Sequence, residues 1–285
     1  MPAMLRAKTR EWLTLEEMDK HERYRALSVY AYACKRIRQF SNKIKIVADI
    51  GCGPCFGVRM LASSFTNIYF IGLDIDPEAL VQARRFVNKL CNVDLVCADA
   101  TMLPFRKKSL DLVTAFELIE HLDLNMASQF LHNVHDTVKV GLILSTPDRY
   151  SSSPFQKPIN PHHRHEFYHT ELLDFIEKHG FMIYDCKGIH QVYRGSWLTY
   201  AVKSLIFWVL PKRLFPQMLR KCCRTLLRKL ARMIRHYLSY NSDILNDSLH
   251  GILMPSKQQS RRVMLIYRNV VLFTLKRNQQ IKNIS

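Results

Sequence analysis

Two carboxylates and an imidazole lie close together in segment 117–121 of this 285-residue chain. Glu117, Glu120 and His121 are three and four positions apart, so on a helix they would share one face. Such a set can transfer protons, or it can bind a divalent cation that lowers the pKa of a hydroxyl group. We therefore predict Glu117 and His121 as catalytic candidates, and all three residues as metal-ligand candidates.

A loop rich in Pro, Ser and His follows at residues 147–165 and carries His162, His163 and His165. A histidine from this loop could complete the set, and we assign His165 to it, both as a catalytic candidate and as a metal ligand. Two plainer interpretations stay open. The loop histidines can be ordinary polar residues, and His121 can cap a pocket or act as a base without a metal.

A second set of residues surrounds a glycine turn. Asp49 lies at the end of a short β-rich run, and Gly51 and Gly53 follow that run, where glycines let the backbone turn tightly against a ligand. Asp74 lies 21 positions after Gly53, at the end of the next predicted strand, where a carboxylate can accept both hydroxyls of an adenosine ribose. A dinucleotide such as NAD also satisfies this pattern.

Three features favour a different nucleoside. Asp49 would repel a pyrophosphate but attract an ammonium group. The turn lacks the third glycine of the dinucleotide fingerprint. Asp99 ends the third predicted strand, where it suits the adenine amine. The predicted ligand combines adenosine with a positively charged amino acid, as S-adenosylmethionine does.

The elements that must position these residues alternate along the chain. Short β-rich runs at 44–50, 68–73, 93–97, 110–116, 140–145, 181–192 and 263–275 are separated by helical patterns. A helix is also expected over 11–40, with Thr14 to Glu17 as its capping box. This order predicts an α/β fold: a Rossmann-like three-layer αβα sandwich with a mostly parallel seven-stranded sheet, N-terminal helices and a helical insertion before the last strand.

Five ordered motifs over about residues 45–190 resemble class I S-adenosylmethionine-dependent methyltransferases, particularly the type-11 group. They are VADIGCGPCFG, GLDIDPEAL, CADATMLPF, LDLVTAFELIEHL and LILSTPDR. The E-x-x-E-H segment is similar to that of metal-assisted O-methyltransferases of ubiquinone biosynthesis and of small-RNA 3′ ends. Cys55 departs from the pattern, because many relatives carry glycine there.

The resemblance implies roles for individual residues. Asp49 would flank the methionine moiety, Asp74 would hold the ribose, and Asp99 would bind the adenine amine. Glu117 would line the pocket floor. The full set placed around the cofactor is Asp49, Gly51, Gly53, Asp74, Ile75, Asp99, Ala100 and Phe116.

The formal net charge of +18 predicts an anionic partner. Segment 197–240 contains ten Lys or Arg and no Asp or Glu, and its residues 218–238 are sharply amphipathic. It can pack on the core, bind an anionic membrane surface, or bind RNA. No secretory signal or spanning segment is evident, and the eight cysteines lack a framework spacing, so we expect buried thiols and a cytoplasmic protein, peripheral at the inner membrane surface if the segment binds lipid.

These observations divide the chain into an N-terminal helical segment (1–43), a cofactor-binding core (44–195), a basic amphipathic insertion (196–255) and a closing strand and tail (256–285). The expected activity is O-methylation of a small, lipid-linked or glycan-type acceptor, with a divalent cation as a candidate second cofactor. Methylation of RNA 2′-hydroxyls is one alternative. A non-catalytic cofactor-binding protein or membrane adaptor is another.

Overall fold

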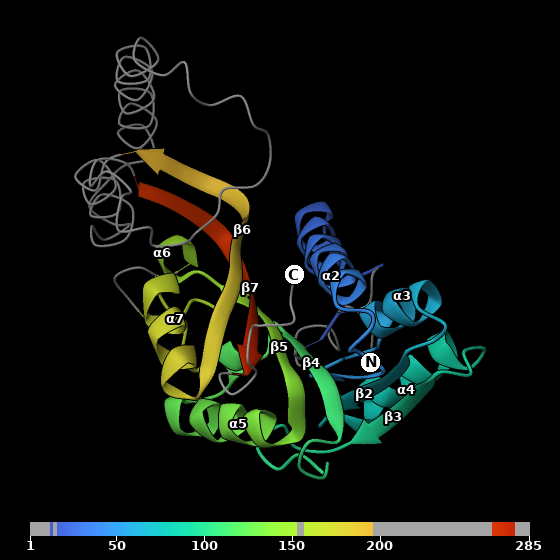
Figure 1. The fold of residues 1–285 in the computed structure, drawn as a ribbon. Helices are drawn as coiled ribbons and strands as arrows, with labels where there is room; N and C mark the ends of the chain where they lie inside the picture. Colours follow the sequence, from blue (N-terminus) through green and yellow to red (C-terminus); the bar gives the residue numbers. More distant parts are fainter. Residues whose placement is uncertain (1–11, 14–15, 153–156, 196–263, 277–285) are drawn as a thin grey trace.

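The computed structural model describes residues 12–13, 16–152, 157–195 and 264–276. Their centre is a seven-stranded sheet with the strand order β3-β2-β1-β4-β5-β7-β6 (Figure 1). The strands are β1 (Ile46–Ile50), β2 (Tyr69–Asp74), β3 (Val93–Cys97), β4 (Leu110–Phe116), β5 (Val138–Pro147), β6 (Phe181–Gly195) and β7 (Met264–Lys276). Neighbours from β3 to β5 pair in parallel, and β7 runs antiparallel to both β5 and β6.

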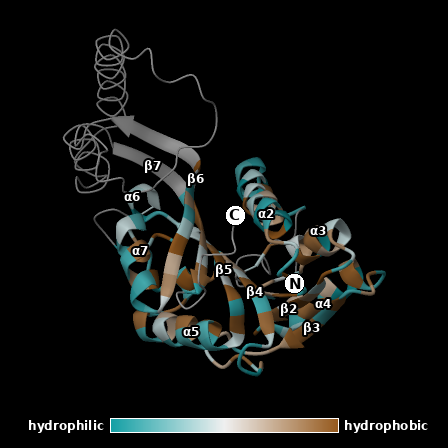
Figure 2. Cartoon of the chain, in the orientation of Figure 1, coloured by the Kyte–Doolittle hydropathy of each residue, from teal (hydrophilic) through white to brown (hydrophobic). Residues whose placement is uncertain are grey.

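Helices cover both faces of this sheet, which confirms the predicted three-layer arrangement. On one face lie α2 (Lys20–Gln39), α3 (Phe56–Ser64) and α4 (Pro77–Val87), and on the other α5 (Leu124–Thr137) and α7 (His169–Lys178). The short α6 (Arg149–Ser152) follows β5. Figure 2 shows mainly hydrophobic residues on the central strands and hydrophilic residues along the outer sides of the helices.

Alternation along the strands builds two separate cores. In β1, Val47 packs with α2 and α3, whereas Ala48 and Ile50 pack with α5 on the opposite face. All of these side chains are fully buried. Since successive strand residues point to opposite faces, a two-sided parallel sheet needs apolar residues at nearly every position. The run IVADI meets that demand except at Asp49, which marks that residue as a special one.

The N-terminal helix begins later than expected. Lys20 is its first residue and Asp19 is its N-cap, accepting hydrogen bonds from the backbone N–H of His21 and Glu22. The Glu22 carboxylate in turn accepts from the Asp19 N–H, so a true capping box lies here. The prediction of a helix from residue 11 was therefore wrong at Trp12, Leu13 and residues 16–19, because the cap made by Asp19 and Glu22 starts the helix at Lys20. Thr14, the first residue of the predicted capping box, lies outside the described residues.

The end of the sheet is a long antiparallel pair. β7 pairs with β5 from Gly141 opposite Leu275 to Pro147 opposite Asn269, and with β6 all the way to Gly195 opposite Met264. The β6–β7 pair therefore continues past the carboxyl end of β5 (Figure 1). This arrangement brings Asn269 to the edge where the parallel strands end. The predicted insertion at 196–255 lies outside the described residues.

Within the part of the chain that the structure describes, no helix combines the length and apolar character needed to cross a bilayer. Among the described cysteines none forms a disulfide, and Cys52, Cys55 and Cys186 are buried as expected, whereas Cys91 and Cys97 are exposed.

Candidate active site

The glycine turn connects β1 to α3 and has an unusual backbone. Gly51 and Gly53 have φ angles of 73° and 52°, which favour glycine. A Cβ on Gly51 would come within 3.0 Å of the Leu118 side chain. Cys55 also has a positive φ, 59°, although it carries a side chain. The departure from glycine noted in the sequence therefore falls on a position whose backbone favours glycine.

Asp74 holds this turn from the end of β2. Its Oδ2 accepts a hydrogen bond from the Gly53 N–H at 2.7 Å, and its Oδ1 accepts from the Asp76 N–H at 2.9 Å. Burial raises the pKa of Asp74, and backbone N–H groups, these two among them, oppose that rise. Each carboxylate oxygen keeps a further lone pair, so the group can still accept hydrogen bonds from ribose hydroxyls.

The other two aspartates lie on strands next to β2. Asp49 lies on β1 opposite Gly72 of β2. Asp99 follows β3, and Cys97 of β3 pairs with Asp74 of β2. Asp99 Oδ1 accepts hydrogen bonds from the backbone N–H and the hydroxyl of Thr101, at 2.7 and 2.8 Å. The three predicted cofactor aspartates are thus brought to one edge of the sheet.

Apolar side chains complete this edge. Ile75 and Met102 are 66% and 68% exposed, although both are large and hydrophobic. Ala100 and Phe116 are buried. Exposed apolar groups beside carboxylates that can accept hydrogen bonds from ribose hydroxyls suit the faces of an adenine ring. Met102 was not among the predicted residues, and its only signal was its place two residues after Ala100.

Asp49 is buried, and side chains hold both of its oxygens. Thr114 Oγ1 donates to Oδ1 at 2.6 Å, and the Tyr30 hydroxyl donates to Oδ2 at 3.1 Å. Burial raises the pKa of Asp49 to about 7, against the opposing effect of these two donors. A nearby ammonium group would stabilise the ionised form. Tyr30 comes from α2, so the N-terminal helix contributes to the site, which local motifs did not reveal.

The sequence predicted one helix for Glu117, Glu120 and His121, but in the structure Glu117 lies before the helix. The 3₁₀ helix begins only at Ile119, and Glu117 has a φ of 53°. The physical reason is that the Glu117 N–H bonds to the Ser145 carbonyl, which continues the β4–β5 pairing by one residue. Its carboxylate accepts from Ser145 Oγ at 2.7 Å and from Asn269 Nδ2 at 2.6 Å. Asn269 comes from β7, far away in the sequence.

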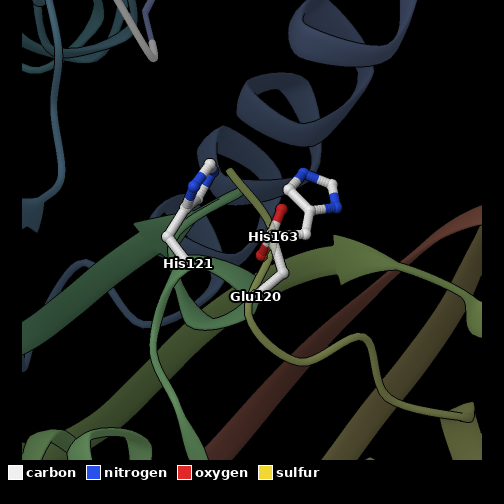
Figure 3. A group of neighbouring side chains, drawn as sticks. All are labelled: Glu120, His121 and His163. Carbon is white, nitrogen blue, oxygen red and sulfur yellow. The ribbon is translucent and has the colours of Figure 1, made fainter. Parts of the chain in front are cut away.

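Glu120, His121 and His163 form a cluster whose candidate ligand atoms all lie within 4.8 Å of one another (Figure 3). Glu120 is 1% exposed, and its Oε2 accepts from Thr146 Oγ1 at 3.0 Å. Its Oε1 has no hydrogen-bond partner among the described residues. Burial, followed by repulsion from Glu117, raises the pKa of Glu120 well above its usual value. A cation at the cluster would relieve both penalties, so the residues present fit a metal ion.

The loop histidine in this cluster is His163, whereas His165 lies outside it. His165 Nε2 is 3.2 Å from Glu171 Oε1, at the start of α7. The backbone N–H groups of Arg164 and His165 both donate to the Glu120 carbonyl, which fixes the loop against the 3₁₀ helix. The two neighbouring histidines thus point to different partners. The repeated His residues in the sequence gave no means of choosing between them.

Comparisons with known proteins agree with this geometry. Residues 47–141 match the model of the methyltransferase domain family. A probable S-adenosylmethionine-dependent methyltransferase of Mycolicibacterium smegmatis is 31% identical over 146 residues, which are 50% of this chain and 54% of that protein. A small RNA 2′-O-methyltransferase of Arabidopsis thaliana is 32% identical over 127 residues, 41% of this chain and 13% of that protein. The chain thus spans about half the length of the first relative, and far less of the second.

A solved structure adds to the sequence relatives. The crystal structure of a small RNA methyltransferase superposes with a TM-score of 0.51 at 25% identity, covering 64% of this chain and 24% of that one. The matched family, the strand order and the edge that carries Asp49, Asp74 and Asp99 lead to one assignment. The core of this chain is a class I S-adenosylmethionine-dependent methyltransferase domain.

Proposed function

We propose that the chain is an O-methyltransferase that binds S-adenosylmethionine along Asp49, Asp74 and Asp99, and a divalent cation at Glu120, His121 and His163. The observation that carries the metal is the buried, unpartnered Glu120 Oε1 beside two imidazoles. When bound, S-adenosylmethionine supplies an already activated methyl group, and the cation lowers the pKa of a bound hydroxyl.

The residues of the chain then have separate tasks. Asp74 and Asp99 orient the adenosine end, and Asp49 attracts the ammonium of the methionine end. Glu120, His121 and His163 would hold the cation, which would lower the pKa of a hydroxyl bound to it. In the sequence, Glu117 lies between the cofactor aspartates and the metal cluster. Hydrogen bonds from Ser145 and Asn269 fix its carboxylate, which can accept the proton of the acceptor hydroxyl. Alignment of the two reactants contributes to the rate enhancement, because it avoids the entropy cost of bringing them together.

Two imidazoles and one carboxylate form a mixed nitrogen and oxygen ligand set. Such a set favours a first-row transition ion over Mg²⁺ or Ca²⁺, which prefer oxygen ligands. Titration calorimetry with Mn²⁺, Zn²⁺ and Mg²⁺ tests the site directly. Wild type should release heat with at least one of them, and Glu120→Ala should not. Equal heats for the two proteins would contradict the metal site.

The acceptor is an RNA ribose hydroxyl in the first version of this proposal. Its support is the likeness to a small RNA 2′-O-methyltransferase in sequence and to a small RNA methyltransferase in structure, together with the net charge of +18, which would attract a polyphosphate. A small or lipid-linked hydroxyl is the second version. Its support is the amphipathic basic pattern of segment 197–240, which suits an anionic membrane surface.

One experiment separates these versions. Purified protein, labelled S-adenosylmethionine and Mn²⁺ are incubated with cell extract, which is then fractionated into RNA, lipid, glycan and protein. Label in RNA that resists alkaline hydrolysis at the modified nucleotide supports the first version, and label in the lipid fraction supports the second. A chain that binds the cofactor but labels no fraction would contradict enzymatic activity and favour a cofactor-binding or adaptor role.

A further inference from the structure

Glu166 lies directly behind the proposed metal cluster. Its side chain is 2% exposed, and its Oε1 is 2.6 Å from His163 Nδ1. Its Oε2 accepts a hydrogen bond from the Ser152 hydroxyl at the end of α6. Both carboxylate oxygens are therefore held inside the protein. Burying a carboxylate costs desolvation free energy, so a carboxylate at this position needs favourable interactions that offset that cost.

The contact with Glu166 decides which nitrogen of His163 is available. A carboxylate only accepts hydrogen bonds, so the hydrogen of the neutral ring is at Nδ1 and the lone pair is at Nε2. His121 is arranged in the same way, because its Nδ1 is 3.2 Å from the His162 carbonyl, which also can only accept. In both imidazoles of the cluster Nδ1 thus faces an oxygen acceptor, which places the lone pair of the neutral ring at Nε2.

Two further histidines of this region also contact carboxylates, but outside the cluster. His165 meets Glu171 through Nε2, and His169 meets Asp148 at 3.1 Å through Nδ1. Glu171 is a useful contrast to Glu166, because its side chain is 40% exposed and its histidine lies outside the cluster. The Glu166 pair combines a buried carboxylate with a cluster histidine.

We propose that Glu166 is a positioning residue for the metal site: it holds His163 in the tautomer and orientation that present Nε2 to the cation, with Ser152 fixing the carboxylate from behind. This inference rests on the proposed function, because it requires the cation at Glu120, His121 and His163. The negative charge of Glu166 also makes the His163 ring a stronger donor to a metal.

The test measures Mn²⁺ affinity by electron paramagnetic resonance, and the visible spectrum of bound Co²⁺, in wild type, Glu166→Gln, Glu166→Ala and Glu171→Gln. Glu166→Gln should weaken Mn²⁺ binding roughly 10- to 100-fold and alter the Co²⁺ spectrum, because outer groups of this kind have effects of that size. Glu166→Ala should weaken binding further. Glu171→Gln, the matched control, should behave as wild type.

S-adenosylhomocysteine affinity serves as the measure of folding, since the hydrogen bonds of Glu166 described above are with His163 and Ser152 and not with the three cofactor aspartates. It should stay unchanged in Glu166→Gln. If wild type binds no Mn²⁺ or Co²⁺, the metal site itself is wrong and the positioning role falls with it. If wild type binds the ions and Glu166→Gln binds them equally well, only the positioning role is overturned. Loss of S-adenosylhomocysteine binding in Glu166→Gln would also overturn it, in favour of a general structural role.

Discussion

The two ends of the candidate active site hold their carboxylates in different ways. At the proposed cofactor end, backbone N–H groups of nearby turns hold Asp74 and Asp99, and Asp49 is the exception, because the side chains of Thr114 and Tyr30 hold it. At the acceptor end, Glu117, Glu120 and Glu166 are fixed by side chains from strands, loops and helices far apart in the sequence. Backbone donors depend on local turns, whereas side-chain donors depend on the whole fold. Substitutions at the acceptor end should therefore change chemistry while leaving cofactor binding intact.

The sharpest test of this comparison uses the two neighbouring loop histidines. His163→Ala should lower the rate of methyl transfer about 100-fold, because a lost metal ligand removes several kcal/mol of transition-state stabilisation. His165→Ala should lower it less than threefold, since His165 contacts Glu171 instead of the cluster. Single-turnover assays at saturating S-adenosylmethionine give both rates. The opposite ranking would restore the role that the sequence alone assigned to His165.

At the cofactor end, Asp74→Ala should weaken S-adenosylhomocysteine binding. Losing two hydrogen bonds to a charged acceptor, together with the support of the Gly53 turn, costs about 3 kcal/mol, or roughly 100-fold in affinity. Calorimetry measures this, and Asp94→Ala, an exposed aspartate of the next strand, is the matched control that should bind normally. An affinity for Asp74→Ala within threefold of wild type would show that the ribose lies elsewhere.

Cofactor binding should also depend on pH through Asp49. Burial raises the pKa of this carboxyl to about 7, so at pH 6 it is mostly protonated and at pH 7.5 mostly ionised. Only the ionised form attracts the ligand ammonium, and S-adenosylhomocysteine affinity should rise by about tenfold between these pH values. Asp49→Asn should remove this dependence. A slope that persists in Asp49→Asn would assign the titration to another group.

The smallest expected effect concerns Asn269, which reaches the acceptor end from β7. Asn269→Ala leaves Glu117 with Ser145 as its remaining side-chain partner, and the lost bond should cost about 1 kcal/mol, or roughly fivefold in transfer rate. S-adenosylhomocysteine affinity should not change. If the S-adenosylhomocysteine affinity falls and the methyl-transfer rate at saturating S-adenosylmethionine does not, Glu117 belongs to the cofactor end, and the proposed division of the site into two ends is wrong.

The same difference explains what the sequence could predict. Asp49 and Asp74 lie in the last two residues of β1 and β2, and Asp99 comes two residues after β3. The carboxyl ends of neighbouring parallel strands meet, so pattern and topology were sufficient there. Tyr30, Ser145, Glu166 and Asn269 had no local signature, because their roles depend on the packing of distant elements. The prediction of one helical face for Glu117, Glu120 and His121 failed for a related reason, since the pairing with β5 continues as far as the Glu117 N–H.

The position of β7 affects how the protein assembles during synthesis. It is the last described strand in the chain, yet it lies between β5 and β6, which are made before it. Until the ribosome has passed residues 196–263, β5 has an open edge and Glu117 lacks Asn269, and at roughly 5–20 residues per second this takes several seconds. An exposed apolar strand edge invites pairing with other chains. The nascent protein should therefore need chaperone protection during that interval, and it should gain activity only after β7 has inserted.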